Sequence, residues 1–269
     1  MNIILVGSTG YLGNKLLKKL LEDNKNNVLS LVRNPNNINN YILINDPKLY
    51  EKINIFNPDM LIYTSCVYDN GINNYMDILK ANFIFPLELM NKIKLKTFIY
   101  IGTSINKYTN QYSLSKNQLA EYGKYYSIHN NINFINILLE TFYGKNEPQN
   151  RFLSTIINKL KNNEEINLTE GNQIRDFIYI EDVINGINII IKSNLKGYYD
   201  IPLGSGEGIS IKELLEYLKT ALNSKSNLNF GVIPLRKNEH SGFADIRKIK
   251  ELGFDIKLGI KESILRYML

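Results

Sequence analysis

The sequence predicts an α/β fold, a doubly wound parallel sheet followed by a smaller C-terminal lobe. Over the first half of the chain, short apolar runs of strand length alternate with longer segments of helical period. The strand-like runs are apolar throughout, which is typical of parallel strands that helices cover on both faces. After Gly144 the rhythm breaks into shorter pieces, which indicates a second and smaller lobe.

The expected elements follow in a regular order. The first helix carries Leu12, Leu16, Leu17 and Leu20 on its inward side. We expect strands at residues 3–6, 28–32, 41–44, 60–64, 98–101 and 134–139, and helices at 11–23, 47–56, 72–93 and 111–127. Later helices are expected at 151–161, 182–192, 211–222 and 246–252, and strands at 166–168 and 174–180. We place the main domain at residues 1–141, with about 174–193 returning to it, and a lobe mainly at 142–269.

The composition excludes several classes of protein. Basic residues exceed acidic ones by 32 − 26 = 6, which suits an anionic ligand but also reflects a chain rich in lysine and asparagine throughout. No basic stripe with interleaved aromatic residues is present, so we expect no nucleic-acid partner. No apolar segment approaches the ~20 residues that span a bilayer, and we see no targeting segment. We therefore expect no membrane association and a cytoplasmic location.

The few cysteines and histidines agree with a cytoplasmic location and indicate no metal site. Cys66 is the single cysteine, so no internal disulfide can form and a reducing compartment is expected. His129 and His240 lie far apart without cysteine or carboxylate companions at ligand spacing, and we expect no metal site.

The first expected strand ends in a glycine-rich turn, Gly7-Ser-Thr-Gly10-Tyr-Leu-Gly13. Glycines here let the backbone approach a pyrophosphate and let the following helix pack on the strand, while free amides at the helix N-terminus face the phosphates. The G-x-x-G-x-x-G spacing is a weak signal alone, but at the head of a βαβ series it predicts a Rossmann-type dinucleotide site. We expect the cofactor to contact Gly7, Thr9, Gly10, Tyr11, Leu12 and Gly13.

The end of the second strand selects the dinucleotide. Strands that bind NAD carry an acid here for the ribose hydroxyls, whereas this one ends in Val32-Arg33-Asn34, with no acid and one arginine. A guanidinium suits the 2′-phosphate of NADP(H). We expect NADP(H), with NAD(H) as the alternative if Arg33 is only an exposed loop charge.

Tyr112 and Lys116 lie one helical turn apart on the same face of an expected helix. A phenol with a pKa of ~10 is a poor proton donor or acceptor at neutral pH, and a nearby ammonium brings this pKa towards the working range. The preceding strand ends in Gly102-Thr103-Ser104, which places a hydroxyl in the crevice where doubly wound sheets bind ligands. Together with the glycine turn, these residues predict an active site.

At this point the chain resembles the extended short-chain dehydrogenase/reductase family, also called the NAD-dependent epimerase/dehydratase family, over nearly its whole length. Asp59 to Cys66 is similar to the family's fourth-strand motif, with Ser65 and Cys66 where alanines are usual, and Asn82 matches an asparagine of the next helix. The string from Arg175 to Val183, RDFIYIEDV, resembles one typical of members that act on sugar nucleotides. Residues 236–254 resemble the family's C-terminal pattern.

The resemblance implies roles by position for the residues around the crevice. Tyr112 is the catalytic acid/base, and Lys116 is its partner and can also bind the nicotinamide ribose. Thr103 holds the substrate oxygen, with Ser104 as the alternative for that role. Ser65 contacts the cofactor.

Two arginines are implied in binding the nucleotide phosphates of the substrate, Arg175 and Arg236. The alternative for Arg175 is a structural ion pair with Asp176 or Asp182. The alternative for Arg236 is simple exposure.

Three differences from the patterns of other family members indicate which reaction type the chain resembles. Ser104-Ile105 follows Thr103 where dehydratases carry Asp-Glu, no cysteine stands beside Thr103 as in reductases that also epimerise, and the gap to Tyr112 is shorter than in 4-epimerases of the UDP-galactose type. The run from Gly102 to Lys116, and that from Leu139 to Gly144, resemble the CDP-abequose and CDP-paratose synthases. The resemblance therefore implies NADPH-dependent reduction of a keto group, at C4, on a nucleotide-linked deoxysugar in polysaccharide biosynthesis.

Two other functions stay open, and one expectation concerns assembly. The chain could be an NAD-dependent nucleotide-sugar 4-epimerase, or a non-catalytic NADP(H) sensor, although such sensors usually lack the Tyr-Lys pair. We also expect a homodimer built as a four-helix bundle from the helices around 72–93 and 111–127, with Phe83, Phe85 and Leu87 as its apolar surface.

Overall fold

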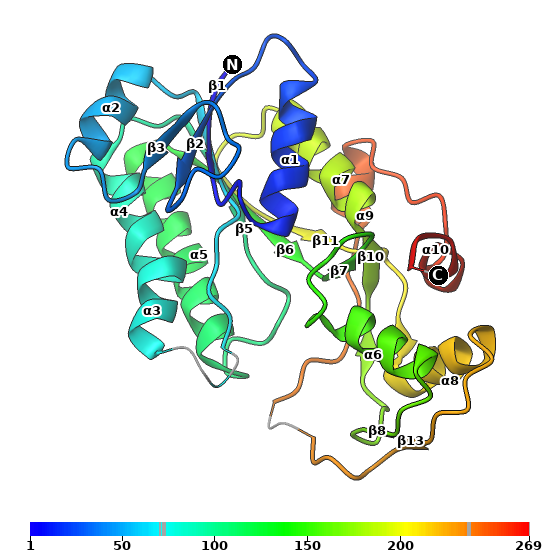
Figure 1. The fold of residues 1–269 in the computed structure, drawn as a ribbon. Coiled ribbons are helices and arrows are strands. Elements are labelled where there is room, and N and C mark those ends of the chain that lie inside the picture. The colour runs from blue at the N-terminus through cyan, green and yellow to red at the C-terminus, as the bar shows by residue number, and fades with distance from the viewer. Residues whose placement is uncertain (70, 72–73, 236–237, 269) are drawn as a thin grey trace. The chain divides into compact units, whose positions relative to one another are not determined.

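The structure, a computed structural model of the chain, describes residues 1–69, 71, 74–235 and 238–268. It divides into two compact units, which Figure 1 shows as ribbons. The first unit comprises residues 1–138 and 187–201, and the second comprises residues 139–186 and 202–269. Each unit is described below by itself.

The first unit is built around a seven-stranded sheet of order β11-β6-β5-β4-β1-β2-β3. Its strands are β1 (Asn2–Val6), β2 (Asn27–Val32), β3 (Tyr41–Leu43), β4 (Met60–Tyr63), β5 (Thr97–Ile101), β6 (Asn133–Leu139) and β11 (Tyr198–Leu203). From β6 to β3 every neighbouring pair is parallel. Along β6 and β11, Phe134 N donates to Gly197 O and Glu140 N to Leu203 O, so this edge pair also runs parallel. The predicted doubly wound parallel sheet is confirmed.

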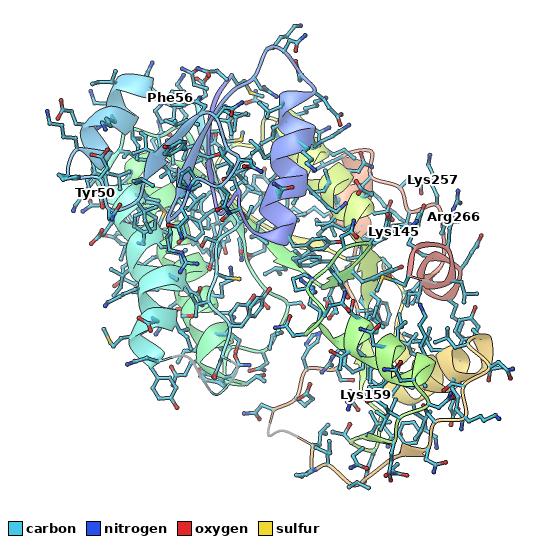
Figure 2. The ribbon with its side chains drawn as sticks, viewed as in Figure 1. Tyr50, Phe56, Lys145, Lys159, Lys257 and Arg266 are labelled. Carbon is cyan, nitrogen blue, oxygen red and sulfur yellow. The ribbon has the colours of Figure 1, made fainter. Side chains whose placement is uncertain are left out.

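Alternate residues of the strands point to opposite faces and bury against different helices. One face packs against α2 (Leu49–Phe56), α4 (Phe85–Lys92) and α5 (Gln111–Asn130), with Tyr63, Phe98, Tyr100 and Phe134 as its largest side chains. Tyr50 and Phe56 of α2 pack partly buried against this cluster (Figure 2). Helix α1 (Tyr11–Leu21) covers the opposite face (Figure 1) and buries Leu12, Leu16 and Leu20 as its leucine spacing predicts, whereas Leu17, also expected to face inward, is only half-buried.

The edge strand β11 was not expected from the sequence. Its residues Tyr-Tyr-Asp-Ile-Pro-Leu mix polar and apolar side chains without the continuous apolar run of the central strands. Pro202 cannot donate a ladder hydrogen bond, which restricts such a segment to a sheet edge. The segment returns to the sheet after α7 (Ile180–Lys192), in which the boundary between the two units falls.

The helix expected at residues 72–93 has an irregular centre, and residues 72 and 73 lie outside the described part of the chain. It consists of α3 (Tyr75–Leu79), a π-helical turn η1 (Lys80–Ile84) and α4. A π turn widens the helix locally. Two buried phenols donate to carbonyls of this turn: Tyr63 Oη to Ala81 O (2.5 Å) and Tyr100 Oη to Asn82 O (3.4 Å).

The second unit packs helices against short strand pairs. Its core is formed by apolar residues of α6 (Phe152–Lys161), α8 (Ile211–Ala221) and α10 (Ile260–Met268), and α9 (Arg247–Glu251) lies in the same unit. The strand pairs are β7 (Thr141–Tyr143) with β10 (Phe177–Tyr179), β8 (Ile166–Asn167) with β13 (Leu228–Asn229), and β9 (Ile174–Arg175) with β12 (Ile209–Ser210).

The strand expected at residues 174–180 is therefore broken at Asp176. This carboxylate is fully buried and accepts hydrogen bonds from Ser205 N and Oγ (both 2.7 Å), Gly206 N (3.0 Å) and Ala244 N (3.1 Å). Four donors from two other segments offset the cost of burying a charge. Asp176 thus binds backbone and hydroxyl donors of two loops and does not pair with a neighbouring strand. The chain leaves one sheet at this residue, so β9 pairs with β12 and β10 pairs with β7.

Candidate active site

The glycine turn joins β1 to α1 through contacts that exclude larger side chains. Gly7 has φ +92°, and a Cβ there would lie 2.7 Å from Ser65 N. A Cβ on Gly13 would collide with the carbonyl of Gly7, whereas Gly10 lies at the exposed tip and its N donates to Gly7 O (3.0 Å). Only glycine fits at the first and third positions, so the helix packs directly on the strand.

The N-terminus of α1 is suited to bind a phosphate. Its cap residue is Gly10, no side chain caps it, and its first turn carries no acid. The first backbone amides of a helix point out of its N-terminal end, where the positive end of the helix dipole also lies. With the positive end of the helix dipole and the exposed Thr9 beside them, these amides fit the pyrophosphate of a dinucleotide.

The carboxyl ends of the neighbouring strands lie beside this turn. Val6 is level with Leu31 of β2 and with Tyr63 of β4, so Arg33 and Ser65 each follow a strand that flanks β1. Arg33 is exposed and Ser65 is half-buried. A guanidinium next to the turn is available for the adenosine end of a dinucleotide.

Tyr112 and Thr103 lie together at the end of β5. Tyr112 stands in the first turn of α5, which a capping box fixes: Ser113 N donates to Asn110 Oδ1 (2.8 Å) and Asn110 N to Ser113 Oγ (3.2 Å). The Thr103 side chain lies near enough to the phenol of Tyr112 to lower its pKa, and the Thr103 hydroxyl accepts from Ile105 N (3.3 Å). Ser104 is half-buried directly after Thr103. The structure thus places a hydroxyl near the predicted acid/base.

Lys116 lies one turn further along α5 and is only 2% exposed. Its ammonium donates to Ile101 O (2.5 Å) and lies 4.5 Å from the ring centroid of Tyr100 and 5.8 Å from that of Tyr112. A cation over aromatic faces is stabilised by their quadrupoles, which partly replaces the lost water. The Tyr-Lys pair is therefore a buried unit and not a surface pair.

Burial shifts the pKa of both groups, and for Tyr112 the direction is opposite to the one expected from the sequence. Loss of water raises the pKa of Tyr112 well above 10, and the Thr103 side chain lowers it only in part. The same loss of water lowers the pKa of Lys116 to about 8. We expected the ammonium to bring the phenol towards ionisation, but burial is the largest cause of both shifts and disfavours the charged form of each group.

Asn82 ties three elements of this site together. Its amide accepts from Val67 N (2.8 Å) and donates to Val67 O (2.9 Å) and to Ser115 Oγ (3.2 Å) on α5. Asn82 is fully buried in the π-helical turn η1. The sequence identified this asparagine only by its resemblance to the family; its hydrogen bonds assign it the task of holding the segment after β4 against α5.

The predicted substrate arginine Arg175 belongs to the second unit. Arg175 forms an ion pair with Glu239 and donates from Nη1 to Ile174 O (3.2 Å), and burial lowers its pKa. The sequence suggested Asp176 or Asp182 as ion-pair partners, but Asp176 is satisfied by Ser205, Gly206 and Ala244. Arg236 lies outside the described residues.

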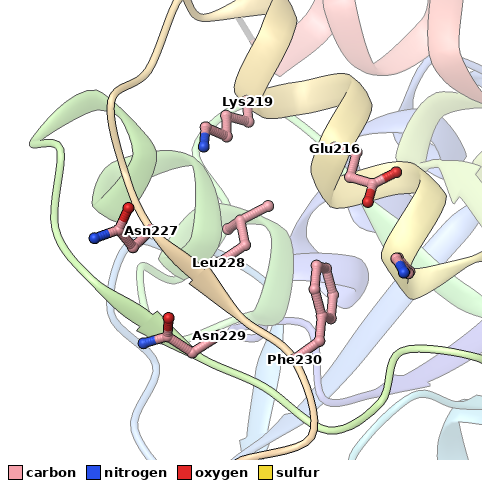
Figure 3. Close-up of a pocket in the computed structure, with 7 residues that line it drawn as sticks. Glu216, Lys219, Asn227, Leu228, Asn229 and Phe230 are labelled. Atoms are coloured by element: carbon pink, nitrogen blue, oxygen red, sulfur yellow. The ribbon is translucent and has the colours of Figure 1, made fainter.

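A shallow groove in the second unit contains no predicted site residue. It has a volume of about 420 Å³ and lies between α8 and β13 (Figure 3). Its lining comprises Lys212, Glu216, Lys219, Asn227, Leu228, Asn229 and Phe230. Within the described ranges, no group of three or more His, Cys, Asp or Glu side chains could hold a metal ion, and no helix is long and apolar enough to cross a membrane.

A glycine-rich turn and a Thr-Tyr-Lys centre at the carboxyl edge of one parallel sheet are typical of dinucleotide-dependent enzymes. Comparison of the sequence with known families agrees with this class. Residues 3–201 match the NAD dependent epimerase/dehydratase family, and the chain belongs to this family. It is 30% identical to the CDP-abequose synthase of Salmonella muenchen, over 99% of this chain and 96% of that protein. It is 26% identical to a putative UDP-glucose 4-epimerase of Methanocaldococcus jannaschii, over 98% and 96% of the two chains.

Solved structures of the same fold cover the whole chain. The UDP-glucuronic acid 4-epimerase of Bacillus cereus, in complex with UDP-glucuronic acid and NAD, superposes with a TM-score of 0.83 at 18% identity, over 98% of this chain and 97% of that one. The UDP-glucose 4-epimerase of Thermotoga maritima, with UDP-glucose, gives a TM-score of 0.83 at 20% identity, over 97% and 96%. They confirm the fold, and the family match together with the CDP-abequose synthase relatives shows that the chain is an enzyme of the short-chain dehydrogenase/reductase type.

The buried Lys116 generates a testable pH dependence of stability. In the unfolded chain its pKa returns to 10.5, so between pH 8 and pH 10.5 the unfolded chain binds more protons and stability rises with pH. The difference corresponds to up to about 3 kcal/mol. In urea unfolding at pH 7 to 10.5, wild type should therefore gain stability relative to Lys116→Met by up to that amount. A constant difference across this range would show that Lys116 is not a buried cation.

Proposed function

We propose that the protein is an NADPH-dependent reductase of a keto group, at C4, of a nucleotide-linked deoxysugar, acting in the cytoplasm in a pathway of polysaccharide biosynthesis. The observation that carries the proposal is the shared burial of Thr103, Tyr112 and Lys116 near the end of β5, with the Lys116 ammonium 5.8 Å from the ring centroid of Tyr112. The similarity to CDP-abequose synthases over the full chain supports the substrate class.

The chain's own residues divide the work of such a reduction. When bound at the glycine turn, the reduced dinucleotide supplies a hydride. Thr103 holds the substrate oxygen and polarises it as negative charge develops, and Tyr112 gives this oxygen a proton. The raised pKa of Tyr112 keeps the phenol protonated before the reaction but makes it a weak acid, so its proton leaves only as negative charge develops on the substrate oxygen. The nearby Lys116 ammonium stabilises the tyrosinate that remains.

We propose that Arg175 and Arg236 bind the phosphates of the nucleotide. The guanidinium of Arg175 is held by Glu239, so a phosphate would have to share it or displace that carboxylate. Ser104 is the second hydroxyl that could hold the substrate oxygen.

A 4-epimerase that retains NAD is the second candidate function. The putative UDP-glucose 4-epimerase among the relatives and the UDP-sugar 4-epimerases among the solved structures, two of them in complex with NAD, favour it. An epimerase keeps its dinucleotide between turnovers, whereas a reductase releases the oxidised form. The absorbance of the purified protein separates the two. A non-catalytic sensor has less support, because the Tyr-Lys pair is intact.

Replacing Tyr112 by phenylalanine tests the chemistry. Tyr112→Phe removes the proton donor and keeps the ring, so NADPH binding should persist while NADPH oxidation falls by roughly two to four orders of magnitude. The assay is NADPH oxidation with 4-keto-6-deoxy sugars linked to CDP, dTDP, GDP or UDP. Tyr41→Phe, at an exposed tyrosine of β3, is the control. Activity of Tyr112→Phe within a few-fold of wild type would remove Tyr112 from the mechanism.

The cofactor proposal rests on Arg33. A guanidinium that binds the 2′-phosphate makes charge-assisted hydrogen bonds worth roughly 1.5–3 kcal/mol, or about ten- to a hundredfold in affinity. Arg33→Ala should therefore weaken NADPH binding by that factor and leave NADH binding nearly unchanged, as measured by titration of both reduced cofactors. Arg247→Ala, at an exposed arginine of the second unit, serves as control. Equal affinity of wild type for NADH and NADPH would favour the epimerase.

We also propose a homodimer formed through α5 and the neighbouring helix. Phe83, Phe85 and Leu87, which we expected to supply the apolar surface, are partly buried against the protein's own core. The exposed apolar side chains are instead Tyr122, Tyr125 and Ile128 on α5 (48%, 57% and 67% exposed), with Met76 and Ile84 on the adjoining helix. Their arrangement supports a four-helix bundle between two copies.

Sedimentation tests this assembly. Wild type should sediment as a dimer, and Tyr125→Glu should sediment as a monomer that still binds NADPH, because a charge at the centre of an apolar interface loses its water. Ile55→Glu, on the exposed face of α2, should remain dimeric. A wild type that is monomeric at every concentration would contradict the proposal.

A further inference from the structure

Tyr68, in the segment that follows β4, lies on the catalytic centre. Its ring stacks on the ring of Tyr112 with a centroid distance of 4.9 Å and an interplanar angle of 27°. Tyr68 is 51% exposed and Tyr112 is 8% exposed, so one face of the Tyr68 ring covers the phenol while the residue keeps contact with solvent. No motif of the sequence pointed to Tyr68.

The backbone around Tyr68 is fixed on both sides. The residue before it, Val67, is bonded through both N and O to the amide of the buried Asn82. The residue after it, Asp69, accepts through its carboxylate from Gln111 N (3.2 Å), the first residue of α5. The stacked position of Tyr68 is thus set by hydrogen bonds that reach η1 and the first turn of α5, the turn that carries Tyr112.

We propose that Tyr68 is a positioning residue for the reaction: its ring holds the phenol of Tyr112 in place and controls the access of water to the hydroxyl that transfers the proton. This inference rests on the proposed function for its catalytic consequence, but the stacking and the shielding concern Tyr112 alone. A stacked aromatic pair gains stability from its offset geometry, and it restricts rotation of both rings.

The Tyr68 ring affects the pKa of Tyr112 and therefore the pH range in which Tyr112 can donate a proton. Burial is the largest cause of the raised pKa of Tyr112, so removing a covering ring lets water return and lowers this pKa towards 10. Reduction needs the protonated phenol, and activity is lost as the pH rises through the pKa of Tyr112. Loss of the Tyr68 ring therefore moves the alkaline limb of the pH profile to lower pH. The groups that face Tyr112 in this balance are Tyr68, Cys66, Tyr100, Thr103 and Lys116.

Direct titration of Tyr112 tests the shielding without any substrate. With tyrosine labelled with ¹³C at Cζ, the Tyr112 signal is identified by its absence in Tyr112→Phe. In wild type and in Tyr68→Phe, which keeps the ring, this signal should remain that of the phenol to the highest pH at which the fold survives. In Tyr68→Ala it should begin to move to the tyrosinate position near pH 10. Equal titration of Tyr112 in wild type and Tyr68→Ala overturns the proposal.

Turnover tests the positioning. With the keto sugar nucleotide that wild type reduces, Tyr68→Ala should lower kcat about ten- to a hundredfold with KM within threefold, and its alkaline limb should shift to lower pH. Tyr68→Phe should restore both properties, and Tyr75→Ala, at an exposed tyrosine of α3, should match wild type. Unchanged kcat and pH profile in Tyr68→Ala overturn the proposal. If wild type reduces no keto sugar, the proposed function fails, and the titration still decides whether Tyr68 shields Tyr112.

Discussion

The close approach of β1, α1 and β4 at Gly7 determines the geometry of the first unit. A Cβ at Gly7 would lie 2.7 Å from both Ser65 N and Thr64 Oγ1, and Thr64 Oγ1 donates to Val6 O (2.8 Å). Residues 65–69 leave β4 at this contact, and hydrogen bonds to Asn82 of η1 and from Gln111 N of α5 hold them beside the catalytic centre. The glycine turn and the ring that covers Tyr112 are therefore linked by one short segment of chain.

The catalytic centre buries two ionisable groups, Lys116 and Tyr112, and different contacts replace the water that each of them loses. Lys116 exchanges its water for a strand carbonyl and an aromatic face, and Tyr112 exchanges its water for the Thr103 hydroxyl and the Tyr68 ring. Neither exchange is complete, since both pKa values move in the direction that disfavours the charged form. A site of this kind favours the neutral phenol and an easily released lysine proton.

Much of the fold could be predicted because the central strands are apolar on both faces and the helices carry regular leucine spacing. The glycine turn, Thr103, Tyr112 and Lys116 could be placed for the same reason, since the carboxyl ends of parallel strands meet at one edge. β11 and the break at Asp176 could not, because each depends on partners distant in the sequence. The direction of the Tyr112 pKa could not be predicted either, because burial depth, unlike helical spacing, cannot be derived from two residues four positions apart.

The π-helical turn makes the length of one helix a functional constraint. Each residue of an α-helix turns the chain by about 100°, so removing one residue from 80–84 would regularise the hydrogen bonds and rotate one flank of the helix relative to the other. Asn82 could then no longer face both Val67 and Ser115, and the carbonyls that receive the Tyr63 and Tyr100 hydroxyls would close into the helix. A shorter helix would have more regular backbone hydrogen bonds, but it would lose the contacts of Asn82 that hold the catalytic site together. The extra residue in the π-helical turn is therefore a requirement of the site and not of the helix.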